Sequence, residues 1–221
     1  MALNKLKFNS LNVTPTAGKT IGFNSSADGL EATLSGGSMR FIKKLTASSS
    51  ATLSFVNGSS DVVLDSTYKE YIFILNNMHP QTSGNNPKMT ASTNTGSSYG
   101  VTATTTDFRA THNEAGSSTS LEYRTATDLA QSTDPVHIFG GTGTGNENDE
   151  CSVGIIHLFN PSSTTFVKHF IARTHGYSDD DRAYSNFSAG YFNTTSAIDA
   201  IQFANNSGNI DAGTITLYGI N

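Results

Sequence analysis

Short apolar runs of four to eight residues recur between turn-forming clusters from Met39 to the C-terminal end of the sequence. Runs of this length, bounded by Gly, Pro, Asn and Ser, are typical of β-strands rather than amphipathic helices. The last run shows the strand period clearly, because Ile215 and Leu217 alternate with Thr214 and Thr216. The chain is therefore predicted to be all-β, an antiparallel β-sandwich of roughly eight to ten strands and of jelly-roll type, with a short N-terminal arm.

Composition supports this fold class and argues against several functions. With 36% hydrophobic and 14% charged residues, the chain is too apolar for a disordered linker and too poor in charge for a helical bundle. The net charge is −5 and no basic run exceeds Lys43-Lys44, so no nucleic acid partner is expected. No apolar stretch approaches the roughly 20 residues of a membrane span, so no membrane insertion is expected either.

Synthesis in the cytosol is predicted from the N-terminal segment and from cysteine usage. No apolar stretch of about 7 to 15 residues follows the first charges, as a secretory signal would require. Cys151 is the only cysteine, which excludes internal disulfides and disfavours a cysteine-based zinc site. Stability must therefore come from packing or from partner chains.

Two pairs of runs are predicted to form hairpins. Residues 153–159 and 166–172 flank Asn160-Pro161-Ser162-Ser163, where Pro fixes φ and Asn hydrogen-bonds its own backbone. Residues 198–203 and 214–220 repeat this arrangement around a second Asn- and Gly-containing turn. Further strands are expected at 39–42, 53–56, 62–64, 71–75 and 136–139.

Residues 71–75 are predicted to form a central strand. They are apolar at both parities, as expected for a strand covered on both faces. Thr67-x-x-Glu70 just before them matches a helix capping box, but the β-branched and aromatic residues that follow favour a strand. The Asn57-Gly58 pair, between two earlier runs, favours a tight hairpin because it accepts positive φ at low cost.

Residues 1–38 are predicted to be an arm, and residues 39–221 the sandwich domain. The first segment is rich in Asn, Ser, Thr and Gly and cannot enclose a core alone. We expect it to pack on a sister subunit or a larger assembly; the alternative is an edge-strand terminus of the same domain. The residues expected to dock the arm are Leu3, Leu6, Phe8, Leu11, Ile21 and Phe23.

No motif for catalysis or cofactor binding is complete. Gly18-Lys19-Thr20 resembles the end of a phosphate-binding loop, but Val13 stands where that motif needs Gly. The alternating glycines Gly141, Gly143 and Gly145 lack the spacing of a dinucleotide-binding loop. The letters G-x-S-x-G occur once, as Gly96-Ser97-Ser98-Tyr99-Gly100, but the surrounding all-β pattern lacks the strand-to-helix turn that a nucleophile elbow needs. The chain is therefore predicted to be non-enzymatic and to need no cofactor.

Histidines and acidic loops do not predict a metal site. None of the six histidines has the i, i+4 spacing of a zinc hydrolase, and His157 and His169, expected to face each other across a hairpin, lack a third ligand. Acidic loops at 147–150 and 178–182 offer oxygen atoms to calcium but lack the spacing of a dedicated loop. Charges paired with nearby arginines at the surface are the simpler interpretation.

Aromatic residues crowd the segment 177–192, which is predicted to be loop-like. Aromatic rings stack on the C–H faces of sugars while neighbouring Asn side chains bind hydroxyls, so this segment is the candidate glycan site. The alternative is packing under a long loop or at a subunit interface. The residues assigned to glycan contact are Tyr177, Tyr184, Phe187 and Tyr191.

Three segments carry a resemblance to a known family. Residues 196–220, from Ser-Ala-Ile-Asp-Ala to Thr-Leu-Tyr-Gly-Ile, look like the C-terminal end of virion structural proteins of tailed bacteriophages, especially those of marine hosts. Residues 67–80 look like an early strand of the same family, and residues 157–162 also fit. The resemblance covers residues 39–221 in patches, leaves the middle unmatched, and carries no catalytic residue.

The resemblance implies a role in the phage particle. It suggests a tail or fibre protein, made in the host cytoplasm and located in the virion, whose arm docks on other proteins of the tail or capsid. Its loops would contribute to contact with a host surface glycan. By analogy with such proteins we expect a homo-oligomer, a trimer. The alternatives are a capsid decoration or head-fibre protein, or a carbohydrate-binding module, and an enzyme is least supported.

Overall fold

A computed structural model describes residues 20–23, 26, 28, 30–33, 38–141 and 143–221. The chain divides into two compact units, Met1–Ser38 and Met39–Asn221. The described residues are strands, turns and irregular segments, and none of them forms a helix that could cross a membrane.

The first unit contains a two-stranded antiparallel sheet, in which β1 (Thr20–Phe23) pairs with β2 (Leu30–Thr33). Ile21 and Phe23, two of the residues predicted to dock the arm, lie on β1 with exposed side chains. The other four predicted docking residues lie outside the described residues, and they are Leu3, Leu6, Phe8 and Leu11. The docking role of the arm therefore stays a prediction.

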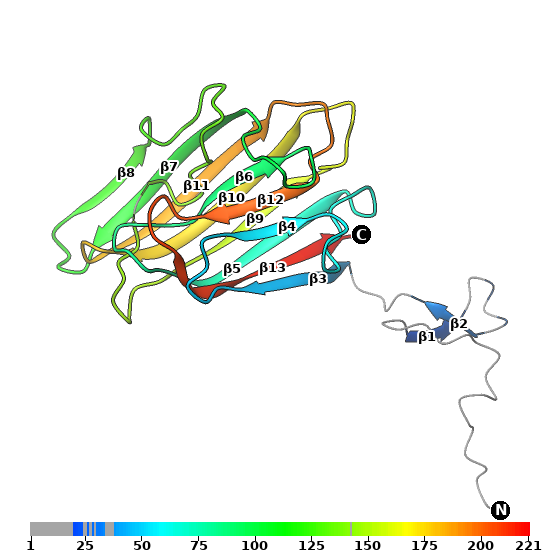
Figure 1. Cartoon of the computed structure of the whole chain (residues 1–221). Coiled ribbons are helices and arrows are strands. Elements are labelled where there is room, and N and C mark those ends of the chain that lie inside the picture. Colours follow the sequence, from blue (N-terminus) through cyan, green and yellow to red (C-terminus); the bar gives the residue numbers. More distant parts are fainter. Residues whose placement is uncertain (1–19, 24–25, 27, 29, 34–37, 142) are drawn as a thin grey trace, which may run out of the picture. The chain divides into compact units, whose positions relative to one another are not determined.

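The second unit is a β-sandwich of two antiparallel sheets (Figure 1). The larger sheet has eight strands in the order β3-β13-β5-β9-β10-β11-β7-β8, and the smaller has three in the order β4-β12-β6. The predicted all-β sandwich is confirmed, while the jelly-roll type stays a prediction. The strands are β3 (Met39–Thr46), β4 (Leu53–Val56), β5 (Glu70–Pro80), β6 (Lys88–Ser92), β7 (Ala103–Asn113), β8 (Thr119–Tyr123), β9 (Ser152–Phe159), β10 (Lys168–Ser178), β11 (Arg182–Phe192), β12 (Ala200–Ala204) and β13 (Ile210–Ile220).

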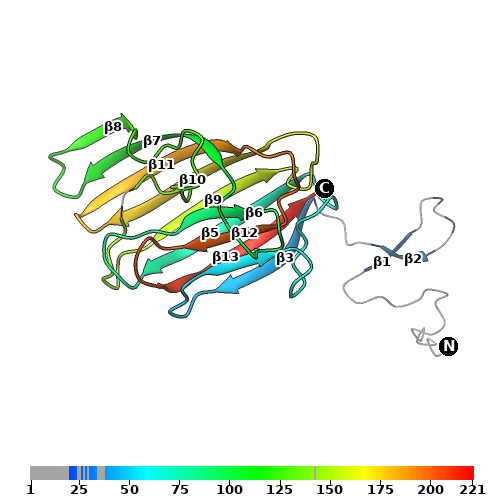
Figure 2. The ribbon, with the colours of Figure 1, turned by 45° about the horizontal axis from the view of Figure 1, so that its top comes forward.

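The core lies between the two sheets. Figure 2 shows the three-stranded sheet lying over one face of the larger sheet. Phe73 of β5 meets Phe55 and Phe203 of the small sheet edge to face, with ring centroids 5.3 and 5.5 Å away. All three side chains are fully buried. Burial of this aromatic cluster holds the sheets together, and its edge-to-face geometry adds about 0.5–1.5 kcal/mol per ring pair.

An irregular segment covers the remaining inner face of the large sheet. Residues 136–139 were expected to form a strand, but this prediction is wrong. Only a single bridge forms, between Val136 and Met89, before Gly140 and Gly141 turn the chain with φ of 60° and 64°. The run is nevertheless core, because Val136, Ile138 and Phe139 are buried and the carbonyl of Ile138 accepts hydrogen bonds from the side chains of β10 and β11.

The two predicted hairpins have different outcomes. The first is confirmed, because β9 and β10 pair in antiparallel fashion with Phe170 opposite Leu158. The second is wrong, because β12 belongs to the small sheet and β13 to the large one. Phe203 of β12 packs on Phe73 of β5 across the core, so β12 lies in the sheet opposite β5 and β13.

The region after Asn57-Gly58 is a turn without a second strand. The Gly58 amide donates to the carbonyl of Val62, as expected for a tight turn, but residues 62–64 are irregular. Val62 and Leu64 are still buried, and the Leu64 amide donates to Asn57 Oδ1 at 2.9 Å. The Asn57 side chain thus accepts the hydrogen bond of the Leu64 amide, which a neighbouring strand would otherwise accept.

Strand β5 lies inside the large sheet, between β13 and β9, as predicted for residues 71–75. Tyr71, Phe73 and Leu75 are fully buried in the core. Ile72 and Ile74, on the opposite face, are only half-buried. The apolar residues at both parities therefore mark an interior position in the sheet, but the second face is only partly covered.

Candidate interaction face

The face of the eight-stranded sheet that points away from the three-stranded sheet is here called the outer face. The alternation of β9 sends Ile156 and Leu158 into the core and Val153 and Ile155 to the outer face. Seven large hydrophobic residues on this face expose much of their surface, and they are Phe41 (63%), Phe108 (43%), Leu121 (77%), Tyr123 (51%), Val153 (37%), Ile155 (44%) and Ile171 (52%).

Strand register places five of these side chains, all but Leu121 and Val153, in two rows that cross the sheet. Residues directly opposite each other in neighbouring strands have Cβ atoms about 4.5–5.5 Å apart, so each row is a line of contacting side chains. One row crosses seven strands, through Thr216, Ile74, Ile155, Arg173, Phe187, Phe108 and Tyr123. A second row runs beside it, through Phe41, Tyr218, Ile72, His157, Ile171, Ala189 and Thr106.

An aromatic stack fixes the position of a guanidinium on the outer face. The rings of Phe108 and Phe187 stack with centroids 5.0 Å apart and planes 4° from parallel. Arg173 lies over the Phe187 ring, with its Cζ atom 5.1 Å from the centroid. A cation over an aromatic face gains about 0.5–1 kcal/mol at an exposed site. Arg173 is therefore held in place before any partner arrives.

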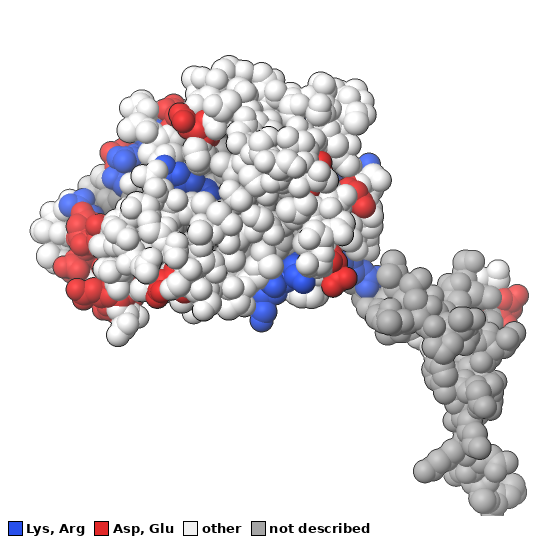
Figure 3. Space-filling view, in the orientation of Figure 1, with Lys and Arg blue, Asp and Glu red and all other residues white. Residues whose placement is uncertain are grey.

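Few charges interrupt these rows and the residues that flank them. Lys44 lies opposite Thr216, where the first row ends, and Arg173 lies in the middle of that row. Glu70 lies opposite Ile220, beside the second row. Glu70 is engaged, since its Oε1 atom lies 2.5 Å from Nδ1 of His157. Charge is low in the chain as a whole, and Figure 3, which shows the opposite side of the second unit with the three-stranded sheet in front, also has a broad area without Lys, Arg, Asp or Glu.

Two hollows indent the outer face. The larger, of about 540 Å³, lies beside Arg173 and is lined by Ile74, Val153 and Ile155. The other, of about 440 Å³, lies where the small residue Ala189 sits among Phe159, Ile171, His169 and Tyr191, which are much larger. The face is thus uneven, with room for side chains of another molecule.

The segment predicted to be a glycan-binding loop is a hairpin of two long strands, β10 and β11. Phe187 and Tyr191 lie on the outer face, because successive side chains of β11 alternate between the two faces and the buried positions are the even-numbered ones. Tyr177 lies at the end of β10, where its hydroxyl donates to Asp181 Oδ1 at 3.0 Å and this hydrogen bond raises its pKa.

Assignment of Tyr184 to glycan contact is wrong. Its side chain points into the core, where it is fully buried. The hydroxyl accepts a hydrogen bond from Asn86 at 3.0 Å and lies 3.1 Å from the hydroxyl of Thr144, and burial raises its pKa to about 12. Strand alternation separates Tyr184 from Phe187 and Tyr191, and the loop interpretation missed this period.

Sequence reasoning also missed the aliphatic part of the outer face. Ile155 precedes the buried Ile156, and Ile171 lies between the buried Phe170 and Ala172. The signal in the sequence was that apolar residues occupy successive positions of these strands, so that both faces of the sheet carry apolar side chains.

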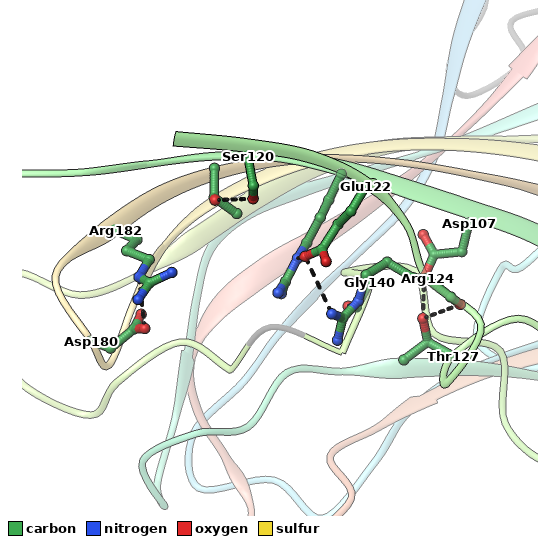
Figure 4. A network of polar contacts seen from close by, with 10 residues as sticks. Asp107, Ser120, Glu122, Arg124, Thr127, Gly140, Asp180 and Arg182 are labelled. Atoms are coloured by element: carbon green, nitrogen blue, oxygen red, sulfur yellow. Dashed lines mark hydrogen bonds and ion pairs between the residues drawn. The ribbon is translucent and has the colours of Figure 1, made fainter. Parts of the chain in front are cut away.

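A polar network at β7 and β8 is the strongest cluster of ionisable groups in this region (Figure 4). Arg109 Nε and Arg124 Nη1 lie 2.8 and 3.3 Å from the same oxygen of Glu122. Asp107 Oδ2 accepts a hydrogen bond from Thr127 Oγ1 at 2.5 Å, and burial raises the pKa of Asp107. Asp107 and Thr127 are both buried, so their hydrogen bond ties the loop after β8 to the sheet.

The acidic loops and the histidines do not assemble a metal site. Asp180 Oδ2 lies 2.8 Å from Nε of Arg182, and the Glu147 amide donates to the Glu150 carboxylate at 2.8 Å. His157 lies opposite Ile171 in the ladder, so the expected pairing with His169 is wrong. Within the described part of the chain, no three His, Cys, Asp or Glu side chains form a group that could hold a metal ion.

Comparison with known proteins adds no relative. No protein-family model, curated protein or solved structure matches the chain. The function is therefore inferred from the outer face and from the sequence.

Proposed function

We propose that this chain is a non-enzymatic structural subunit of a tailed-bacteriophage virion, a tail or fibre protein that assembles with copies of itself and with other virion proteins. The observation that carries the proposal is the outer face, a largely apolar surface that extends across the large sheet. Monomeric proteins rarely expose apolar patches beyond a few hundred Å². A subunit that is permanently assembled can carry such a surface because its partner covers it.

The sequence supports the virion setting. Residues 67–80, 157–162 and 196–220, which carry the resemblance to phage virion proteins, correspond to β5 with the turn before it, the β9 end with its turn, and the region of β12 and β13. All three belong to the sandwich and build its framework. A shared framework is the kind of likeness expected between structural proteins, whose working parts are surfaces rather than reactive side chains.

The test is the composition of the particle. Purified virions of the phage that encodes this chain would be analysed by mass spectrometry, and gold-labelled antibodies against the sandwich domain would locate it. Labelling at the tail is expected, and labelling over the head would favour the decoration or head-fibre alternative. Absence of the chain from purified particles would refute the proposal. Deletion of residues 2–36 tests the arm, because a docking arm is needed for incorporation while the sandwich still folds.

Carbohydrate binding is a second candidate function, favoured by one observation. The hollow around Ala189 is flanked by Tyr191 and Phe159, two rings of the kind that stack on sugars. Binding on an array of host polysaccharides should then be lost in Tyr191→Ala and kept in Tyr177→Ala, because Tyr177 lies at the far end of β10. Absence of binding to every polysaccharide would remove this candidate.

A further inference from the structure

We infer that the outer face is where one copy of this chain docks on a second copy, with the protruding edge side chains of one copy entering the central hollows of the next. The docking face rests on the proposed function, which requires a homo-oligomer, and it assigns the surface that forms one. Area, composition and shape each favour this occupant.

The exposed hydrophobic area is close to that of a stable interface. The seven large hydrophobic residues of the outer face are between 37% and 77% exposed. With about 200 Å² for each complete side chain, they present on the order of 700 Å². Each partner in a standard interface buries about 800 Å². The half-buried residues between them, such as Ile72 and Ile74, supply the remainder.

The composition of the outer face is that of an interface core between proteins. Such cores are poor in charge and rich in aromatic residues and Arg, and homomeric cores are the most apolar. Here Arg173 on the Phe187 ring is the one charge in the middle of the rows. The side chains of Ile74, Ile155 and Ile171 have no hydrogen-bond donor or acceptor, so they cannot bind the hydroxyls of a sugar. A protein surface therefore fits better than a glycan.

The shape of the outer face provides complementary parts. Leu121 and Tyr123 project from the edge strand β8, and Phe41 projects from the opposite edge strand β3. The hollows lie over β9, β10 and β11, at the centre of the sheet. The projecting and receiving parts lie at different places on the same face, so the projecting side chains of one copy meet the hollows of another when the two faces pack together. Where such contacts run head to tail and the rotation closes, they form a ring, which is the arrangement of the trimer that the resemblance to phage virion proteins implies.

Sedimentation equilibrium of the purified full chain tests the inference. Leu121→Glu removes a projecting group and Ile171→Glu places a charge beside a hollow. The matched control is Phe166→Glu, which changes a similarly exposed residue in the connection between β9 and β10, away from the outer face. Wild type and the control should be oligomers of the same mass, about three times the 23.4 kDa of one chain. Both outer-face variants should shift to one chain mass while keeping the circular dichroism spectrum of the wild type.

A monomeric wild type at micromolar concentrations would overturn the inference, and so would outer-face variants that remain oligomers. If a variant fails to fold, hydroxyl-radical footprinting of the wild-type oligomer decides. Tyr123 and Phe108 should be protected from oxidation relative to Phe166, and equal oxidation would refute docking at this face. Saturable binding of a polysaccharide or another virion protein to a monomeric chain would identify a different occupant and also refute it.

The inference and the proposed function fail in different ways. A chain that is present in virions but monomeric in solution, with an oxidised outer face, would keep its role in the virion but lose both self-assembly and the docking face. A chain that forms the expected oligomer but is absent from purified virions would retain the docking face and lose the function.

Discussion

Replacement of His137 by Gln should make the protein less sensitive to acid. His137 lies in the segment 136–139 that covers the inner face of the large sheet, and it is half-buried. Burial there lowers its pKa from 6.5 to about 4, with a smaller contribution from the charge of Lys88. The folded protein therefore keeps this imidazole neutral at pH values where the unfolded chain has already bound a proton.

The sign and size of the effect follow from this difference. As the pH falls from 6.5 to about 4, only the unfolded state gains the proton, so the free energy of unfolding decreases; below about 4 both states are protonated and the decrease stops. The pKa values of His137 in the unfolded and folded states differ by about 2.5. Because one pKa unit corresponds to about 1.36 kcal/mol, this difference corresponds to about 3 kcal/mol. Gln takes no proton, so His137→Gln should lack this loss.

Urea denaturation at a series of pH values between 7 and 4 provides the assay. The free energy of unfolding of His137→Gln minus that of the wild type should grow by about 3 kcal/mol toward pH 4. His112→Gln, which removes an exposed histidine from β7, controls for the loss of a surface imidazole. A difference between His137→Gln and wild type that stays constant with pH would refute the burial of His137 and the position of its segment.

Three further changes probe the sandwich itself. In urea denaturation at pH 7, Phe73→Ala should lower the free energy of unfolding by about 3–5 kcal/mol because it empties the centre of the aromatic cluster. Phe166→Ala, at an exposed site, should change it by less than about 0.5 kcal/mol. Burial raises the pKa of Asp107 above 3.8 in the folded protein. As the pH rises from 3.8, the carboxyl therefore ionises first in the unfolded chain, and the free energy of unfolding decreases. Asp107→Asn should abolish this decrease in urea midpoints measured between about pH 4 and 7. Gly140→Ala should cost more than about 1 kcal/mol, because φ is +60° and the new Cβ would overlap Asn186 Oδ1; an unchanged melting temperature would argue against this turn.

Local chemistry made part of the fold predictable. The β9–β10 hairpin follows from the Pro161 turn between two apolar runs, since everything that determines it lies within a short stretch of sequence. The inward direction of Ile215 and Leu217 follows from strand alternation in the same way. These features depend on neighbours along the chain.

The incorrect predictions depend on distant contacts. β12 has the pattern of a hairpin partner for β13, but its backbone pairs with β4 and β6, which lie more than a hundred residues earlier. Residues 136–139 have strand composition, yet Met89 offers only one bridge before the glycines turn the chain. The strand propensity of a segment does not show which other strand, if any, is placed to pair with it.

The candidate site was predictable only in outline. The segment 177–192 was recognised as rich in aromatic residues, and Phe187 and Tyr191 do lie on the outer face. Their companion Phe108 comes from β7, and strand pairing alone brings it opposite Phe187. A surface assembled from eight strands cannot be recognised from one segment of sequence.

An averaged electron-microscopy map of the purified full-length oligomer tests the central claim most directly. We predict that neighbouring copies cover Ile155 and Ile171 on each sandwich and that Leu121 of one copy projects into the hollow of the next. Copies joined through any other surface, with these isoleucines facing solvent, would contradict the account.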